Sequence, residues 1–452
     1  MLEDVDLSDL ESMVRGDVLR PGGKDYELGR RVFNAMIDRH PAAIVRCADA
    51  HDVIAAVNCS RSHDVPLSVK GGGHSVAGAA VCEGGIMVDL SPLKAVRVDP
   101  DRQVAVAQPG LTLGEFDSAA QAFGLATTMG VVSMTGIAGL TLGGGIGWLN
   151  GRYGLACDNL IGAEVVTADG RVLSASDVEH EDLFWAIRGG GGNFGIVTSF
   201  SYRLHPVSTV LAGGVVFAPR HAHQALRFYH DFARDTPDEL ATAASIWLDD
   251  DRRPTVSVGV CYCGSVERGE EVLRPLRAFG PPTMDDIAPV SYAALQSSKD
   301  EGFPSGRLHY WKSSILRDVT DGAIETILSL VADAPSPFTG VGLQQVCGAA
   351  SRVLPTATAF PHRGQLYDFL ILSQWDDAAD SADNISWTQR LFEEMQPFLE
   401  SAVYANNLGE EGTDRVRAAY GPNYSRLAAI KAQYDPANVF RLNHNITPAP
   451  TN

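Results

Sequence analysis

The stretch VKGGGHSVAG at residues 69–78 decides the fold of this chain. Consecutive glycines after a β-rich run let several backbone N–H groups turn towards one anion, because no Cβ blocks its approach. Two further clusters follow, GLTLGGGIG at 139–147 and RGGGGNFG at 188–195. Three such loops in one part of the chain indicate a large phosphate-bearing ligand rather than three unrelated tight turns.

These loops do not match the common nucleotide-binding signatures. The GxxxxGK[ST] pattern of a P-loop does not occur in the sequence. GLTLGGGIG lacks both the GxGxxG spacing of a Rossmann turn and its trailing acidic residue. The glycine clusters therefore favour a different mode of phosphate binding.

Length and charge restrict the possible partners. A chain of 452 residues is too long for one compact core, so we expect two domains. It carries 36 Lys and Arg against 55 Asp and Glu, which gives a formal net charge of −19. That excess repels nucleic acid and anionic membranes, so we expect neither as a partner.

The sequence also predicts a cytoplasmic location. The N-terminus MLEDVDLSDLESM is acidic and has no apolar stretch of the kind found in signal peptides. No window approaches the length of apolar sequence that a membrane-spanning helix needs. The seven cysteines are scattered and odd in number, which favours a reduced protein over a disulfide framework. The pair in Cys261-Tyr-Cys263 lacks a partner pair, so we expect no metal site.

Hydrophobic patterns predict an α+β fold with an antiparallel sheet in its second part. Strands are expected at 42–47, 66–72, 85–90, 95–100 and 103–110, the last three forming a meander, and a hairpin at 164–175. Helices are expected at 48–63, after the Asp49 cap, and after a capping box at Thr112. The second part has strands at 212–218, 241–248, 255–264, 341–348 and 366–375, with helices between them, for instance at 320–333.

Glycine density falls after residue 205, so a domain boundary is placed near His205-Pro206. We expect a first domain at 1–205, a second at 206–405 and a C-terminal segment at 406–452 that returns to the first domain. That segment reads as a helix followed by a turn at Asp435-Pro436.

Four segments resemble the flavin oxidases related to vanillyl-alcohol oxidase and p-cresol methylhydroxylase, in their berberine-bridge-enzyme-like branch. They are RCADAHDVIAAVNCSRSHDVPLSVKGGGHSVAG (46–78), GLTLGGGIGWLNGRYGLACDNL (139–160), RGGGGNFGIVTSF (188–200) and YGPNYSRLAAIKAQYDPANVFRLNHNI (420–446). The resemblance runs from about residue 30 to the C-terminus. It implies a two-part FAD-binding domain of the p-cresol methylhydroxylase type and a separate substrate domain.

The resemblance implies a set of FAD-binding residues. His74 would be the covalent anchor, bonded through an imidazole nitrogen to the 8α-methyl group of the flavin. The other cofactor-binding positions that we expect are Val69, Gly71, Gly72, Gly73, Ser75, Gly78, Pro109, Gly110, Gly130, Ser133, Thr135, Gly136, Gly139, Gly145, Gly195, Ile196, Val197, Asn443 and Asn445. Alternatively, His74 would be a hydrogen-bonding loop residue beside non-covalent FAD, and Asn443 and Asn445 would cap the end of a helix.

Part of this branch attaches FAD a second time, through a cysteine. Ser133-Met134 stands where that cysteine would lie, so we predict a single covalent bond. Cys157 lies some twenty residues too late, and a buried free cysteine is commonly a packing residue.

The catalytic base is less well defined. Arg352 stands where berberine bridge enzyme has a glutamate before its FPHR segment, which speaks against C–C coupling. Of the Tyr-x-x-Tyr pair in carbohydrate oxidases of the branch, only Tyr404 is present, in Tyr404-Ala-Asn-Asn407, where it is either the base or a wall of the flavin site. Further pocket candidates are Tyr153, Gln345, Tyr367, His362 and Gln374, although each of these residue types is individually more often core or sheet packing.

The resemblance predicts a flavin-dependent oxidase that removes a hydride from a C–H bond next to oxygen or nitrogen of a small molecule. Dioxygen would reoxidise the flavin and leave as hydrogen peroxide. An oxygenase or oxidative cyclase of natural-product biosynthesis stays open, as does a dehydrogenase with another acceptor. A flavin-retaining binding protein without catalysis is the non-enzyme alternative. We expect a monomer or homodimer.

Overall fold

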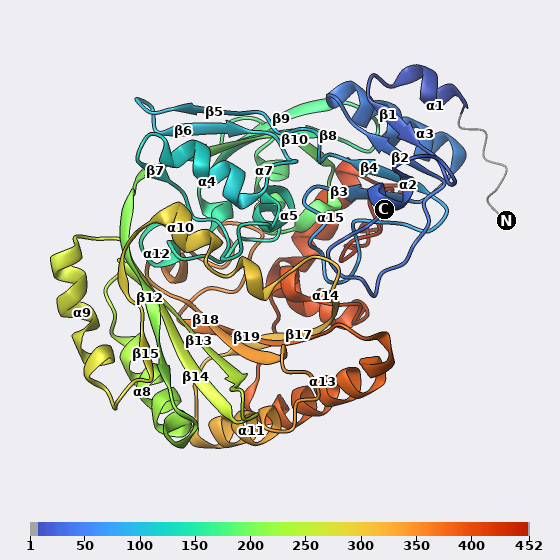
Figure 1. Ribbon diagram of the computed structural model, residues 1–452. Coiled ribbons are helices and arrows are strands. Elements are labelled where there is room, and N and C mark those ends of the chain that lie inside the picture. The colour runs from blue at the N-terminus through green and yellow to red at the C-terminus, as the bar shows by residue number, and fades with distance from the viewer. Residues whose placement is uncertain (1–7, 451–452) are drawn as a thin grey trace.

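The computed structural model of the chain describes residues 8–450. In Figure 1 the N-terminal segments form an upper part with two main sheets, and one large sheet with helices beneath it forms the lower part. The predicted α+β class and the antiparallel sheet backed by helices are confirmed.

A four-stranded sheet in the order β1-β2-β4-β3 carries the opening glycine loop. Its strands are β1 (Asp17–Leu19), β2 (Ala43–Arg46), β3 (Leu67–Lys70) and β4 (Ile86–Asp89). Helix α3 (Ala50–His63) connects β2 to β3, and the Asp49 side chain caps it by accepting from His51 N–H. Because β4 pairs in parallel with both β2 and β3, the predicted meander from β4 onwards is wrong. Its three strands belong to two different sheets, since only the second and third of them pair with each other.

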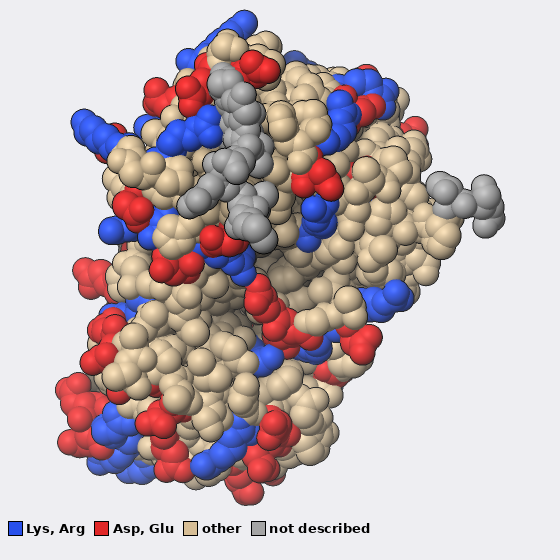
Figure 2. Space-filling view, turned by 90° about the vertical axis from the view of Figure 1, so that its right-hand side faces the viewer, with Lys and Arg blue, Asp and Glu red and all other residues tan. Residues whose placement is uncertain are grey.

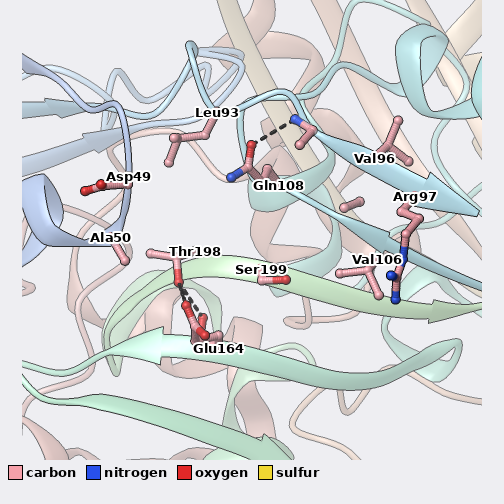
Figure 3. A pocket seen from close by; sticks show the side chains of 12 residues that line it. Asp49, Ala50, Leu93, Val96, Arg97, Val106, Gln108, Glu164, Thr198 and Ser199 are labelled. Carbon is pink, nitrogen blue, oxygen red and sulfur yellow. Dashed lines mark hydrogen bonds between the residues drawn. The ribbon is translucent and has the colours of Figure 1, made fainter. Parts of the chain in front are cut away.

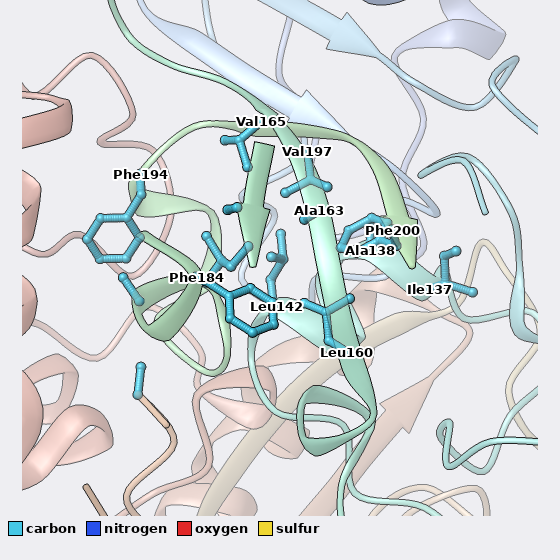
Figure 4. Close-up of a cluster of buried hydrophobic side chains, with 14 of the residues drawn as sticks. Ile137, Ala138, Leu142, Leu160, Ala163, Val165, Phe184, Phe194, Val197 and Phe200 are labelled. Carbon is cyan, nitrogen blue, oxygen red and sulfur yellow. The ribbon is translucent and has the colours of Figure 1, made fainter. Parts of the chain in front are cut away.

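The second sheet has the order β5-β6-β10-β8-β9 and is antiparallel. Its strands are β5 (Val96–Asp99), β6 (Val104–Ala107), β8 (Leu160–Val166), β9 (Val172–Ser176) and β10 (Ile196–Arg203). The capping box predicted at Thr112 is present at the start of α4 (Leu113–Gln121). Figure 4 shows Phe184, Phe200 and Leu142 in the core under this sheet, with α5 (Ile137–Leu142) and α7 (Glu181–Ile187) contributing to it.

The third sheet has the order β15-β12-β14-β13-β18-β19-β17, with β16 also paired to β12. Its strands are β12 (Thr209–Phe217), β13 (Leu240–Leu248), β14 (Pro254–Tyr262), β15 (Met284–Asp285), β16 (Ala288–Ser291), β17 (Leu308–Leu316), β18 (Gly340–Val346) and β19 (Leu366–Trp375). Four helices pack on one face of it: α8 (Ala222–Arg234), α9 (Val266–Ala278), α11 (Asp321–Val331) and α13 (Ser381–Met395). Its other face is turned to the upper part of the molecule (Figure 1).

The C-terminal helices α14 (Thr413–Tyr420) and α15 (Tyr424–Tyr434) pack in the same core as α4 and α5. Lys431 of α15 is fully buried, and its Nζ donates to Asp435 Oδ2 at 2.6 Å and to the carbonyl of Asn193 at 2.7 Å. These contacts attach the end of the chain to the glycine-rich segment around residue 190. The division at residues 205 and 405 stays a prediction.

A buried acid–amide pair joins the upper part to the lower one. Asp117 of α4 is fully buried and accepts from Nε2 of Gln296 at 3.1 Å, on α10 (Tyr292–Ser297). Neither Asp117 Oδ1 nor Gln296 Oε1 has another partner within the described chain. Burial raises the pKa of Asp117 from 3.8 to about 7. A protonated carboxyl group can donate to the amide oxygen, which would satisfy both atoms.

We expect Asp117→Asn to stabilise the protein above pH 7, by about 2 kcal/mol. A folded-state pKa above the unfolded one means that folding favours the protonated acid. The stability contribution of Asp117 is therefore fully present below pH 3.8 and is lost as the pH rises through about 7. Asparagine makes the same pair without charge at every pH. Urea unfolding at pH 5 and pH 8.5 measures the effect, and equal changes at both pH values would contradict it.

Candidate active site

The opening glycine loop presents a row of free backbone donors. From residue 71 to residue 77, no backbone N–H donates to an acceptor within the part of the chain that the structure describes. Gly73 has φ +69 and Gly78 has φ +71, a backbone conformation that side chains other than glycine rarely adopt. A curved run of free N–H groups is an anion-binding arrangement. It follows β3, where the loop leaves the sheet.

Two other backbone segments, at Gly136 and at Pro109, lie against the opening glycine loop. A Cβ on Gly72 would lie 2.5 Å from Cα of Gly136, and a Cβ on Gly71 would lie 3.2 Å from the carbonyl of Pro109. Only glycine permits this approach of two backbones. One turn further on, a Cβ on Gly139 would meet nothing within 4 Å, and this residue is exposed although it lies on α5 among buried neighbours. Together these segments form a cradle with open space beside α5.

His74 lies at the end of this cradle with a neutral ring. Its Nε2 is buried and has no partner among residues 8–450. The Phe33 ring stacks on the imidazole with centroids 3.8 Å apart and 15° between the planes. Phe33 is held in place by its own N–H, which donates to the Gly73 carbonyl at 3.0 Å. Burial lowers the pKa of His74 to about 4, so the imidazole has a free lone pair at neutral pH.

The other glycine-rich loop and the C-terminus meet nearby. Asn443 donates from Nδ2 to the carbonyl of Gly192 at 3.0 Å, while its Oδ1 is buried without a partner in the described chain. Asn445 Oδ1 is also buried and has no hydrogen-bonding partner in the described chain. Free N–H groups, an open cradle, unpartnered amide oxygens and a neutral histidine fit a dinucleotide with a polar ring system, as FAD has.

Several other predicted cofactor positions have contacts within the protein. Ser133 donates from Oγ to Asp300 Oδ2 at 2.6 Å, so its hydroxyl is engaged by the lower part of the molecule. Gly145 N–H donates to the Tyr404 hydroxyl at 2.9 Å. Ile196 and Val197 are core side chains, so only their backbone is available to a ligand. The remaining predicted positions are Val69, Ser75, Gly110, Gly130, Thr135 and Gly195. A role for each towards FAD stays a prediction.

The large sheet turns an unusually open face to this cradle. On β13, Ala244 and Ile246 face the helices and are fully buried, whereas the alternating residues Ala243, Ser245 and Trp247 are half-buried. The strands on either side of β13 show the same alternation. Their half-buried residues on this face are Ser257 and Gly259 on β14, and Gly342 and Gln344 on β18. This part of the face is therefore only partly covered, and we call these residues the floor: Ala243, Ser245, Trp247, Ser257, Gly259, Gly342 and Gln344.

Apolar contacts with the upper part surround the floor. One cluster joins Trp148 to Cys261, and a second joins Ile146 to Val346. A third joins Phe33, which stacks on His74, and Val76, which is two residues from His74 in sequence, to Trp311 of β17. Asn34 strengthens this last contact, because its Nδ2 donates to the carbonyls of Val76 and His309 at 2.8 and 3.0 Å. The floor therefore lies beneath the cradle and next to His74.

A buried carboxyl group stands beside the floor. Asp368 of β19 pairs in register with Gln344, accepts from Ser313 Oγ at 3.0 Å and accepts from Asn407 Nδ2 at 2.5 Å. It is 1% exposed, and burial raises its pKa from 3.8 to about 7. Such a carboxyl group can gain and lose a proton near neutral pH. We missed it in the sequence, although it is the one acidic residue within the predicted strand LYDFLILSQW.

Tyr404 is close to this group and is fully surrounded by protein. Its hydroxyl accepts from Gly145 N–H and from Asn406 Nδ2, which lies 2.7 Å away, and makes no other hydrogen bond in the described chain. Burial raises the pKa of Tyr404, and the negative charge of Asp368 contributes in the same direction. The phenol is therefore protonated at neutral pH and can donate its proton to a neighbour.

Two of the other predicted pocket residues point away from the floor, so they are not pocket residues, and the remaining three contact neighbouring groups of the protein. Gln345 and Tyr367 face the helices because side chains alternate along a strand: Gln345 bonds Thr242 and the Ala233 carbonyl, and Tyr367 bonds His230. Tyr153 stacks on the His205 ring at 3.9 Å. The two remaining candidates are engaged by backbone carbonyls, His362 by that of Ala419 and Gln374 by those of Gly302 and Phe338.

A separate surface pocket of about 360 Å³ lies on the outer face of the second sheet (Figure 3). It is lined by Leu93, Val96, Val106 and other residues of β5, β6, β8 and β10, together with the start of α3. In Figure 3 the Thr198 hydroxyl bonds Glu164, which occupies the polar side of this pocket. The pocket shares no lining residue with the cradle or the floor, so it is not part of the candidate active site.

The face in Figure 2 carries acidic and basic side chains interspersed, and it is hollowed at mid-height. No continuous basic stripe crosses this face. Among the described helices, none combines the length and the apolarity needed to cross a membrane.

Comparison with known proteins identifies the family. A family model described as an FAD binding domain matches residues 41–176, and one described as berberine and berberine like matches residues 403–447. An FAD-linked oxidoreductase of Dictyostelium discoideum is 31% identical over 440 residues, covering 96% of this chain and 95% of that protein. The chain belongs to the berberine-bridge-enzyme-like family of FAD-linked oxidoreductases.

Further members of this family agree in sequence and in structure. The (R)-6-hydroxynicotine oxidase of Paenarthrobacter nicotinovorans is 30% identical over 453 residues, covering 96% of this chain and 97% of the relative. The crystal structure of 6-hydroxy-D-nicotine oxidase from Arthrobacter nicotinovorans superimposes with a TM-score of 0.90 and 30% identity, covering 96% and 98% of the two chains. The predicted family and fold are confirmed, and the chain is an FAD-dependent oxidoreductase of this family.

Proposed function

We propose that this protein is a flavin-dependent oxidase that removes a hydride from a carbon next to oxygen or nitrogen of a small molecule. The observation that carries the proposal is Asp368, a buried carboxyl group with a pKa raised to about 7 beside the floor and the cradle. Bound FAD supplies the hydride acceptor, and dioxygen returns it to the oxidised state with release of hydrogen peroxide.

The protein's own residues prepare the substrate. The unprotonated Asp368 accepts the proton of the substrate hydroxyl or amine, and Ser313 and Asn407 hold the carboxylate by donating to its two oxygens. Tyr404 stays protonated and fixes the wall beside it through Gly145 and Asn406. The packed clusters around the floor exclude water from the site.

We further propose that His74 is the single covalent tether of FAD. Support comes from its neutral imidazole, its unpartnered Nε2 and the stacked Phe33 ring that fixes its orientation. At the position of a second anchor, Ser133 is bonded to Asp300 and Met134 has no thiol. Cys157 is fully buried in the cluster around Tyr404, and burial raises the pKa of its thiol.

The oxidase reaction is tested by photoreducing the bound flavin without oxygen and then admitting air. We expect the flavin absorbance to return within seconds, with peroxide formed in a one-to-one ratio to flavin. Slow reoxidation would assign the protein to the dehydrogenases. Incorporation of labelled oxygen into a product would indicate an oxygenase. A flavin that no alcohol, sugar, amine or phenolic compound reduces would overturn the enzymatic proposal in favour of a binding protein.

A further inference from the structure

The centre of the floor is lined by very small residues. Ser257, Ser245 and Gly342 are paired across three adjacent strands, so they form one row on the face towards the cradle. A Cβ added to Gly342 would lie 3.8 Å from Leu372 Cδ1 and 3.9 Å from the Leu370 carbonyl, which are ordinary contacts. No side chain longer than a hydroxymethyl group therefore rises from this row. The row is a shallow trough between taller neighbours.

One end of the trough is aromatic. Trp247 pairs with Gly340, and a Cβ on Gly340 would lie 2.6 Å from Cδ2 of the indole, so the ring lies over the backbone of β18. Trp247 and Phe303 pack in the same cluster as Trp311, which is 8% exposed. Within the described chain the indole Nε1 of Trp311 is buried and has no acceptor.

His309 adds a second unpartnered polar group at this end. It is 1% exposed, and neither ring nitrogen has a partner among residues 8–450. Its ring stacks on Phe33 at 4.3 Å, and Phe33 in turn stacks on His74. The aromatic end of the trough is therefore continuous with the histidine that we propose as the flavin tether.

The other end of the trough is polar. Gln344 pairs with Asp368 on one side and with Ala243 on the other, and it is half-buried. Its amide makes no hydrogen bond to another described residue, so it is available to a ligand. The two ends are four residue steps apart along one strand, from Gln344 to Gly340, which is about 13 Å. A fused aromatic ring with a one-carbon arm, together with a van der Waals contact at one end and a hydrogen bond at the other, spans that distance.

We propose that the floor binds a flat aromatic molecule that carries an alcohol or amine at one end. The ring system lies in the trough against Trp247 and Trp311, and the oxidisable end reaches Gln344 and Asp368. A sugar would place hydroxyl groups against the face of the Trp247 indole, which offers them no hydrogen-bonding partner. The inference concerns the substrate class, and it rests on the oxidase proposed above.

Three probes test this class on the FAD-loaded enzyme without oxygen: 2-naphthylmethanol, the redox-inert 2-naphthamide, and glucose. We expect 2-naphthamide to perturb the flavin absorbance spectrum saturably, and 2-naphthylmethanol to bleach it. Trp247→Ala should weaken 2-naphthamide binding at least tenfold. Gly342→Leu should abolish binding, because the new side chain would fill the trough. Leu248→Ala is the matched control, since Leu248 packs on the opposite, helix-covered face of the same strand.

The outcomes separate this inference from the proposed function. Glucose that bleaches the flavin while 2-naphthamide does not bind would overturn the aromatic class and leave the oxidase intact. Binding of 2-naphthamide that depends on Trp247, without bleaching by any alcohol or amine, would support the trough and overturn the oxidase. Unchanged binding in Trp247→Ala would overturn the inference even if the Gly342 variant fails to fold.

Discussion

Asp368→Asn is expected to lower the rate of flavin reduction by substrate about 10²–10⁴-fold, the usual contribution of a positioned general base. The amide keeps the hydrogen-bonding shape of the site but cannot accept the substrate proton. Stopped-flow bleaching of the flavin without oxygen measures the step directly. FAD content should stay near that of the unsubstituted protein, because the side chain volume is unchanged. Above pH 7 the unfolding midpoint should rise, as in Asp117→Asn, because the variant has no buried charge at this position.

The pH dependence gives a sharper signature for the same residue. Because Asp368 acts as a base, the reduction rate should rise with pH through about 7, where its carboxyl group loses its proton. This rise of the rate with pH, which we call the pH limb, should be missing in Asp368→Asn. Ser313→Ala should move the limb to higher pH, since the Ser313 hydroxyl donates to the carboxylate and lowers the Asp368 pKa.

Asp117→Asn provides a matched control for Asp368→Asn. Asp117 is also fully buried with a pKa raised to about 7, but it lies at the contact between α4 and α10 and not on the floor. This variant should change the stability above pH 7 and leave the reduction rate unaltered. If Asp368→Asn retains both the rate and the pH limb, Asp368 is not the base, and Tyr404→Phe becomes the variant to measure.

His74→Ala is expected to eliminate covalent flavin entirely. Protein precipitated with acid should retain yellow, fluorescent flavin when His74 is present and should release all of it to the supernatant in the variant. The backbone donors of residues 71–77 do not depend on the imidazole, so non-covalent FAD should still bind. Flavin fluorescence in a denaturing gel gives the readout without any assay of activity.

Two further variants test why attachment occurs at His74. Phe33→Ala should slow attachment, because the ring that stacks on the imidazole at 3.8 Å would no longer hold its orientation. Cys157→Ser should leave attachment intact, since this thiol is buried in another cluster. Free FAD in the supernatant of the unsubstituted protein would contradict the tether, and loss of attachment in Cys157→Ser would show a second anchor.

Local sequence patterns determined much of the architecture. Turn glycines, caps and alternation predicted most strands, the Thr112 capping box and the antiparallel sheet, because these features depend on residues close together in the chain. The meander failed for a non-local reason. Each strand was found correctly, but pairing of β4 with β2 and β3 depends on contacts across helix α3 and the glycine loop.

In the candidate active site, too, some features follow from local sequence and others only from tertiary structure. The sequence by itself determined the glycine loops, His74 and the family, since a phosphate cradle is made largely of consecutive residues whose backbone needs no Cβ. Only the tertiary structure decided which side chains face it. Gln345 and Asp368 lie on neighbouring strands, yet strand register turns one to the helices and the other to the floor. Burial in the folded protein raises the pKa of Asp368, while hydrogen bonds from Ser313 and Asn407, which are distant in sequence, lower it; no local pattern records this environment.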